Sequence, residues 1–278
     1  WSTVLNEFAL KIGLPVLLFS ALAKVPFSFT AEARLIISNS IFVLASLLMA
    51  VITGKILRLE KRMLRTLFIC FVFGNTAYLG IPILIQTSGE KILPEASLIV
   101  AVYLFWIFSI GIGYLDYSTE QNKKAVIKNI LGNIAKNPLL LAVILGIIIG
   151  SLKITLPAIL LKSLDMITAS VTPTVLIVIG LFIGKSGIGK LTEWFSPLLF
   201  SILTLMILPA GFYFGAKLFG FMPAEFSTSI IQAAMPLAIT PFALADKYSL
   251  DKTFIARSIV LSTILSAASL PLWINIVI

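Results

Sequence analysis

The sequence predicts an all-α membrane protein that crosses the bilayer many times. Of its 278 residues, 59% are hydrophobic and 12% are charged, and the mean hydropathy is +1.08. A water-soluble globule of this composition would not have enough polar surface. Apolar runs near the ~20 residues that a helix needs to cross a bilayer recur along the whole chain. Two of these runs are interrupted by glycine, proline and small polar residues at matching places.

Nine candidate spans follow one another along the chain. Their approximate bounds are 4–23, 34–57, 65–87, 94–116, 137–152, 156–184, 194–218, 225–245 and 253–276. The longest connection, Tyr117 to Lys136, divides the chain into a first unit (1–117, four helices), a cytoplasmic linker (118–136) and a second unit (137–278, five helices). An amphipathic helix from Lys124 to Ile134, lying at the membrane surface, is the alternative for the linker.

The surplus of basic residues is explained by topology. There are 21 Lys and Arg against 12 Asp and Glu. One set of alternate connections carries fourteen of the basic residues, including Lys247, Lys252 and Arg257, and the opposite set carries five. The positive-inside rule then places the first set in the cytoplasm and the C-terminus outside. No nucleic-acid partner is needed to account for the charge.

Composition also argues against enzymatic chemistry. Cys70 is the only cysteine and there is no histidine, so an intrachain disulfide, a zinc site and Ser-His or Cys-His catalysis are not expected. The segment Gly184–Lys190 lacks the order of a phosphate-binding loop and follows a membrane helix rather than a strand. We therefore expect no enzyme activity, no cofactor and no direct use of ATP.

Two proline-centred matches indicate an internal repeat. Pro15 and Pro173 lie 158 residues apart in similar contexts, and Pro82 and Pro241 in the broken spans lie 159 residues apart. A repeated unit of five spans must insert with opposite orientation, so an inverted repeat of two five-helix units is expected. The counterpart of the span at 137–152 would precede residue 1, and we expect a tenth, N-terminal helix there.

The two breaks, 73–82 and 233–241, predict a carrier's substrate site. Backbone groups released from a helix persist at membrane depth only where they are buried in protein or line a cavity. Where half-helices meet, amide N–H groups and positive dipole ends face one point, which suits an anion, and unwound carbonyl groups face another. The alternative is that both breaks are ordinary kinks whose polar groups are satisfied by neighbouring helices.

Polar and aromatic residues near the breaks complete the predicted site. Asn75, Thr76 and Thr240 supply hydrogen-bonding groups, the amide of Gln232 needs a partner inside its span, and Tyr103 could stack on an organic substrate or simply pack. The predicted substrate-binding residues are Gly74, Asn75, Thr76, Gly80, Pro82, Tyr103, Gln232, Met235, Pro236, Thr240 and Pro241.

Two further features concern coupling and helix packing. Asp165 is expected near the middle of the bilayer with Lys162 one turn away, as a protonatable coupling group or as half of a structural ion pair. Three glycine pairs, Gly146 with Gly150, Gly180 with Gly184 and Gly211 with Gly215, have the spacing that allows close helix approach, and we expect them to mark packing within the chain.

The first break carries a family resemblance. The run Gly74-Asn75-Thr76-Ala77-Tyr78-Leu79-Gly80-Ile81-Pro82, together with Lys136-Asn137-Pro138-Leu139 and Ala233-Ala234-Met235-Pro236, resembles the auxin efflux carrier family. The bacterial and archaeal branch, which includes malate and malonate permeases, is more similar than the plant branch, whose long hydrophilic loop is absent. The resemblance implies the ten-helix inverted-repeat fold shared with bile-acid sodium symporters, in which helices four and nine are unwound and cross, and it makes a homodimer reasonable.

A secondary or facilitative carrier of a small organic anion, a carboxylate or an auxin-like molecule, is therefore the predicted function. It would sit in the cell membrane among lipids and use alternating access driven by an ion gradient or the membrane potential. A carrier-shaped ligand sensor without net flux and a sodium-coupled symporter are the alternatives. The coupling ion, proton or sodium, stays open, and Asn75, Thr76 and Thr240 with free carbonyls could supply oxygens to sodium.

Overall fold

The computed structural model describes residues 2–25, 29–119, 123–185 and 191–278. Within these ranges the regular structure is helical, apart from one isolated antiparallel bridge between Gly74 and Leu237. The prediction of an all-α membrane protein is therefore confirmed.

Several helices of the first half are preceded or joined by a single π-helical turn. The helices of this half are α1 (Ser2–Phe8), α2 (Leu14–Ala23), α3 (Phe29–Ile56), α4 (Lys61–Cys70), α5 (Ile81–Ser88), α6 (Leu93–Trp106), α7 (Ile112–Thr119) and α8 (Lys123–Ala135). The π-helical turn Ala9–Gly13 joins α1 to α2, Thr76–Gly80 leads into α5, and Ile107–Gly111 joins α6 to α7.

The second half contains two of the three longest helices among the described residues. It contains α9 (Pro138–Ser151), α10 (Ala158–Lys185), α11 (Phe195–Ile202), α12 (Leu208–Leu218), α13 (Ser227–Ala233), α14 (Thr240–Leu244) and α15 (Lys252–Val277). The π-helical turn Leu203–Ile207 joins α11 to α12.

Six stretches of the described chain are long and apolar enough to cross a membrane without a break. They are Thr3–Ala23, Glu32–Ile56, Glu90–Ser118, Ala158–Gly184, Phe195–Leu218 and Lys252–Val277, and each matches a predicted span. The predicted spans at 65–87 and 225–245 are broken, as expected. The span at 137–152 is the 14-residue α9, which bends by 56° from α8. The predicted linker, 118–136, consists mainly of α8 where it is described.

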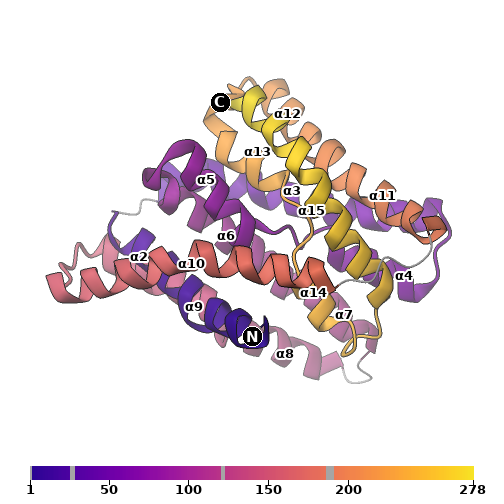
Figure 1. The fold of residues 1–278 in the computed structure, drawn as a ribbon, viewed down its shortest axis with the longest axis horizontal. Coiled ribbons are helices and arrows are strands. Elements are labelled where there is room, and N and C mark those ends of the chain that lie inside the picture. The colour runs from indigo at the N-terminus through magenta and orange to yellow at the C-terminus, as the bar shows by residue number, and fades with distance from the viewer. Residues whose placement is uncertain (1, 26–28, 120–122, 186–190) are drawn as a thin grey trace.

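The helices form two groups with α6 between them (Figure 1). In the first group α2 packs along α9 and against α10. In the second, α3 packs on α4, and α15 packs on α11 and α13. There are two apolar cores: Leu17 and Val175 belong to the first, and Phe71 and Ile259 to the second. Helix α13 and the C-terminal part of α15 also pack into the first core. The broken spans contribute to both cores, so the breaks lie where the cores meet.

Glycines allow α9 and α2 to approach closely. A Cβ atom added at Gly150 would lie 2.3 Å from the carbonyl oxygen of Val25 and 2.5 Å from that of Leu22. At Gly146 the corresponding distance is 2.9 Å, to the carbonyl oxygen of Phe19. These atoms belong to the backbone and cannot rotate away. The predicted role in helix packing is confirmed for this pair. It is not confirmed for the other two pairs, because an added Cβ at Gly180, Gly184, Gly211 or Gly215 would meet no atom within 4 Å outside the local helix backbone.

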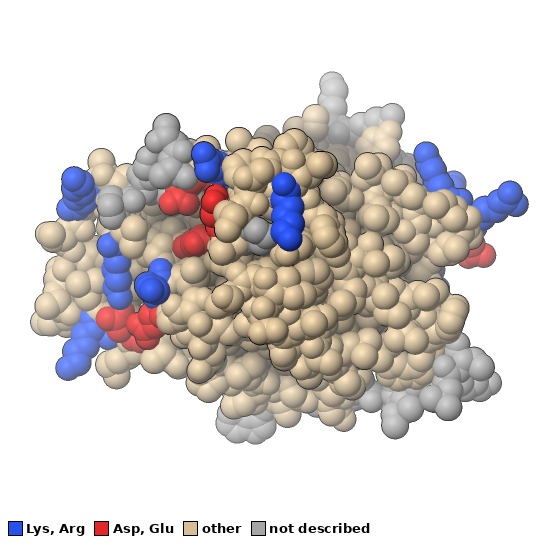
Figure 2. All heavy atoms as spheres, turned by 90° about the horizontal axis from the view of Figure 1, so that it is seen from above, with Lys and Arg blue, Asp and Glu red and all other residues tan. Residues whose placement is uncertain are grey.

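The outer surface is strongly apolar. Ile159 and Leu218 are each 84% exposed, and many other aliphatic side chains point outward. Figure 2 shows a broad uninterrupted area of uncharged side chains on one face, with most of the charged ones nearer the two ends of the long axis. Exposed apolar surface of this extent is stable when acyl chains rather than water surround it.

We predict that Gly150→Ala lowers the free energy of unfolding by about 1–3 kcal/mol, because the added methyl group forces α9 away from the end of α2. The matched control is Gly180→Ala on α10, where no atom outside the local helix backbone lies within 4 Å of the added Cβ. Thermal unfolding of both variants in detergent measures the difference. Equal melting temperatures would contradict the packing role of Gly150.

Candidate functional site: the crossing of two broken helices

The two breaks are joined directly through their backbones. The Asn75 N–H donates to the carbonyl oxygen of Pro236 at 2.7 Å, and the Ala238 N–H donates to that of Phe73 at 2.8 Å. This antiparallel pairing, centred on Gly74 and Leu237, satisfies groups that neither interrupted helix can satisfy itself. The breaks are therefore one structural unit, which we call the crossing (73–76 and 235–240).

The local sequence explains where each helix stops and restarts. Helix α4 ends at Cys70, and the chain is non-helical until the π-helical turn that begins at Thr76. Pro241 occupies the first turn of α14, where the missing N–H costs nothing because it would have no intrahelical partner. Pro82 is the second residue of α5 and directly follows the π-helical turn Thr76–Gly80. Single π-helical turns frequently accompany functional sites.

A cavity of about 100 Å³ lies against one side of the crossing. Its polar lining includes Asn75, Thr76 and Thr240 from the two breaks, with Asn6 of α1 and Tyr103 of α6. Most of the remaining lining is aliphatic or aromatic, from α2, α6, α9 and the segments beside the breaks. The structure therefore brings together in one cavity residues that lie far apart in sequence.

The cavity faces the beginnings of both second half-helices. The turn Thr76–Gly80 runs on into α5, and α14 begins at Thr240, so both positive helix ends lie at the cavity. The Asn75 carbonyl accepts from the N–H groups of Leu79 and Gly80, while its buried carboxamide has no hydrogen-bond partner among the described residues. The described lining includes no lysine or arginine, so an anion here would be held by neutral donors.

The other predicted residues lie behind or beside this cavity. The backbone oxygen of Pro236 is used in the pairing, and Gly80 lies against the carboxamide of Gln232, whose Oε1 would be 2.9 Å from an added Cβ. Gln232 and Met235 do not line the cavity of Thr240. They line a second, smaller cavity of about 20 Å³ on the other side of the crossing.

Tyr103 belongs to both cavities. Its ring stacks on Phe42 with a centroid distance of 5.9 Å, so part of its predicted aromatic role is packing. Its hydroxyl is buried without a hydrogen-bond partner. Gly74 is the other residue that lines both cavities.

Sequence reasoning missed two side-chain hydrogen bonds that hold the crossing. The Tyr78 hydroxyl donates to Oδ1 of Asn6 at 2.9 Å, which links α1 to the turn after the first break. The Leu237 N–H donates to Oγ of Ser262 at 3.1 Å. Ser258, Ser262 and Ser266 recur every four residues on α15 and are all buried. This polar stripe within an apolar span was a signal that could have identified Ser262.

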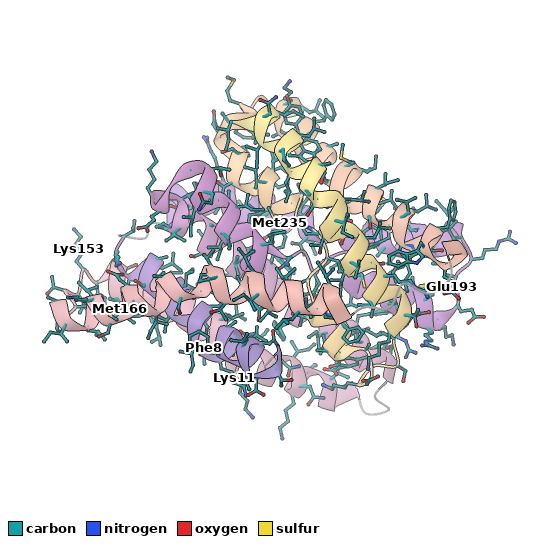
Figure 3. The ribbon with its side chains drawn as sticks, viewed as in Figure 1. Phe8, Lys11, Lys153, Met166, Glu193 and Met235 are labelled. Atoms are coloured by element: carbon teal, nitrogen blue, oxygen red, sulfur yellow. The ribbon has the colours of Figure 1, made fainter. Side chains whose placement is uncertain are left out.

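The expectation that Asp165 pairs with Lys162 was wrong, and its role in proton coupling stays a prediction. Its carboxylate pairs with the ammonium group of Lys24 at 2.6 Å rather than with Lys162, and its side chain is 56% exposed. Asp165 also lies away from the crossing: Figure 3 shows the next residue, Met166, toward the end of α10 near Lys153, while Met235 lies at the centre of the molecule. The direct contact with Lys24 compensates the negative charge of Asp165.

A polar cluster anchors the segment after the second break. Tyr248 donates to Oδ1 of Asp116 at 2.9 Å, the Asp251 N–H donates to the hydroxyl of Thr66 at 2.8 Å, and Arg62 donates to the carbonyl of Leu250 at 3.1 Å. Burial, reinforced by the hydrogen bond to Asp116, raises the pKa of Tyr248 above its ordinary range. These contacts hold the end of α14 against α4 and α7.

Comparison with known proteins agrees with this architecture. Residues 2–274 match the family described as "Membrane transport protein", and the chain belongs to that family, as its resemblance to auxin efflux carriers predicted. It is 26% identical over 276 residues to an uncharacterized transporter of Methanocaldococcus jannaschii, covering 97% of this chain and 88% of the relative.

A second relative carries a named substrate. The chain is 22% identical over 271 residues, which is 95% of this chain and 83% of the relative, to a Rhizobium meliloti protein named "Putative malonate transporter". An uncharacterized transporter of Methanothermobacter thermautotrophicus is 24% identical over 277 residues, covering 98% of this chain and 88% of its own length.

We predict that Ser262→Ala lowers the free energy of unfolding by roughly 1–3 kcal/mol, because the Leu237 N–H at the crossing loses its buried acceptor. Ser266→Ala is the matched control, since the Ser266 hydroxyl bonds only the Thr263 carbonyl within its own helix. Thermal unfolding in detergent measures both variants. Equal melting temperatures would contradict the role of Ser262.

Proposed function

We propose that the chain is a secondary carrier that moves a small organic carboxylate across the cell membrane by alternating access. The observation that carries the proposal is the direct hydrogen bonding of two broken spans, with the positive ends of both second half-helices at one cavity. This arrangement is typical of carriers that bind anionic substrate groups at discontinuous helices. Membership of a transporter family supports the same class of function.

The chemistry of the cavity favours a single carboxylate attached to an apolar body. The free N–H groups at the two helix beginnings carry partial positive charge, and together with the Asn75 and Thr76 side chains they can stabilise one negative charge. A second carboxylate would face aliphatic side chains such as Leu14, Val100 and Leu104, and it would lose its hydration without a cation to replace it. We therefore expect monocarboxylates to be preferred over dicarboxylates, although the Rhizobium relative is named for malonate.

The energy source in this proposal is an ion gradient or the membrane potential. The sequence contains no ATP-binding motif, and a catalytic activity is not part of the proposal. One helix group would move against the other, and this movement would open the crossing to each side of the membrane in turn. Substrate would be released on the open side.

The proposed orientation has the C-terminus outside. Arg62 and Lys252, two basic residues assigned to the cytoplasm from sequence, both flank the anchored segment after the second break. Their proximity supports placing both residues on the same side of the membrane. The inverted repeat, its division at 118–136 and a homodimer stay predictions of the sequence.

Uptake into proteoliposomes tests the proposal. The full-length protein should accumulate labelled lactate or indole-3-acetate more rapidly than malonate. Asn75→Ala should lower uptake by roughly tenfold or more, since a hydrogen bond to a charged group contributes about 1.5–3 kcal/mol. Asn129→Ala, at an exposed position on α8, is the matched control and should transport normally.

Binding of these carboxylates without flux would contradict the carrier and support the ligand sensor instead. Equal effects of Asn75→Ala and Asn129→Ala would remove Asn75 from the substrate site.

Cysteine labelling in intact cells tests the orientation. Lys153→Cys should react with a membrane-impermeant maleimide, whereas Lys247→Cys should react only after the cells are permeabilised, because we place these exposed positions on opposite sides. The unaltered protein is the control, since its one cysteine, Cys70, is buried. The reverse labelling pattern would invert the proposed topology.

A further inference from the structure

A third cavity lies where two membrane spans begin side by side. Its volume is about 260 Å³, which is larger than either cavity at the crossing and close to the lower end of the roughly 300–1,000 Å³ of small-molecule sites. No residue of the crossing, 73–76 and 235–240, belongs to its described lining. Figure 3 shows Glu193, which adjoins this cavity, at one end of the molecule, while Met235 lies at the centre. We call this cavity the basic pocket.

The described lining of the basic pocket contains two cationic side chains and no carboxylate. Lys252 comes from the first turn of α15 and Arg257 from the second. The remaining lining residues are Trp194, Phe242, Thr253, Ala256 and Val260. Because both charges on the wall are positive, the interior of the pocket favours an anion.

Aromatic rings hold the two cations at the wall of the pocket. The guanidinium carbon of Arg257 lies 5.9 Å from the ring centroid of Trp194, and the ammonium nitrogen of Lys252 lies 5.1 Å from that of Phe242. The face of an aromatic ring attracts a cation at such distances. The charges are therefore positioned before any ligand arrives.

Each cation also has a carboxylate partner outside the described lining. Lys252 pairs with Asp246 at 2.6 Å, and Arg257 pairs with Glu193 through Nη2. The side chains of Asp246 and Glu193 are 78% and 45% exposed, whereas that of Arg257 is 13% exposed, so solvent screens the carboxylates more strongly than the guanidinium. An ammonium has three N–H donors and a guanidinium has five, which leaves both cations able to bind a second anion from the pocket side.

The pocket lies at the depth of lipid headgroups. The span Lys252–Val277 begins in its lining, and the span Phe195–Leu218 begins one residue after Trp194. Helices α11 and α15 pack against each other, so the two spans start at the same membrane surface. Tryptophan is enriched at membrane–water interfaces. A ligand in the pocket therefore meets headgroups and water on one side and the hydrocarbon core on the other.

An exposed apolar stripe continues from the pocket along α15. Val260 lines the pocket, and Ile264, Ala268 and Leu272 follow it at four-residue intervals, which place them on one face of the helix. Ile264 is 57% exposed and Leu272 is 46% exposed. A ligand with its anionic group in the pocket can lay an acyl chain along this stripe. A small water-soluble anion would leave the stripe unused.

From this geometry we infer that the basic pocket binds the phosphodiester group of an anionic phospholipid, with Lys252 and Arg257 contacting the phosphate oxygens and an acyl chain lying along the stripe of α15. Basic pockets between membrane helices bind anionic lipid headgroups, and the planar fork of a guanidinium suits bidentate pairing with phosphate. A zwitterionic lipid brings its own ammonium group toward the same two cations. The pocket therefore prefers phosphatidylglycerol to phosphatidylcholine, and this preference does not depend on the proposed carrier function.

Native mass spectrometry of the purified full-length protein in detergent tests the site. Phosphatidylglycerol titrated into the micelles should bind more tightly than phosphatidylcholine. The double substitution Arg257→Gln with Glu193→Gln removes one cation from the pocket without changing the net charge or leaving Glu193 unpaired. It should weaken phosphatidylglycerol binding by about tenfold or more. The matched control is Lys217→Gln, which removes an exposed lysine from above the ring of Tyr213 at the end of α12 and should leave binding unchanged.

Glu193→Gln alone should act in the opposite direction. It releases Arg257 from its carboxylate partner, so phosphatidylglycerol should bind more tightly than to the unaltered protein. If the double variant at Arg257 and Glu193 does not fold, Lys252→Gln with Asp246→Asn removes the other cation with its partner and should show the same loss of affinity.

Equal binding of the two lipids by the unaltered protein, or undiminished phosphatidylglycerol binding after removal of a pocket cation, would overturn the inference. A water-soluble competitor, glycerol phosphate, separates a lipid from a free phosphate compound. It should displace phosphatidylglycerol only weakly, because it has no acyl chain to cover the stripe of α15. Displacement at concentrations equal to that of the lipid would reject the phospholipid and assign the pocket to a soluble phosphate.

Discussion

The pair of backbone hydrogen bonds that joins Phe73 and Asn75 to Pro236 and Ala238 is the interaction on which the rest of the structure depends. Inside the hydrocarbon core of a membrane, no water is present to hydrogen-bond an unpaired N–H or carbonyl group. Each break is tolerable because the other break supplies its partners, and Ser262 satisfies one N–H more. Without this mutual pairing, neither span could be interrupted inside the two apolar cores.

The pairing also fixes the electrostatics of the centre. Breaking two helices at one point creates two positive and two negative helix ends, and the crossing sorts them to opposite sides. The described linings of the two cavities at the crossing contain no charged side chain, so this site uses dipoles in place of fixed charges. A carrier must also change its access state when empty, and a neutral site avoids burying an unpaired charge in that step.

The features predictable from sequence were those encoded locally. Apolar runs and the Gly-Asn and Pro interruptions predicted the spans and both breaks, and Gln232 was noticed because an amide is unusual in a span. Asp165 failed because spacing along one helix suggested Lys162, whereas its partner Lys24 comes from the end of another helix. The link from Asn6 to Tyr78 and the sorting of helix ends into two cavities depend on three-dimensional packing, which one sequence does not display.

The central claim is that an organic anion binds where the two second half-helices begin. The most direct measurement is the anomalous scattering from a bromine-substituted aromatic carboxylate bound to crystals of the full-length protein. The account predicts one bromine peak within the cavity lined by Asn75, Thr76 and Thr240, with the carboxylate toward the helix ends. A peak confined to another part of the molecule, with that cavity holding no carboxylate, would contradict it.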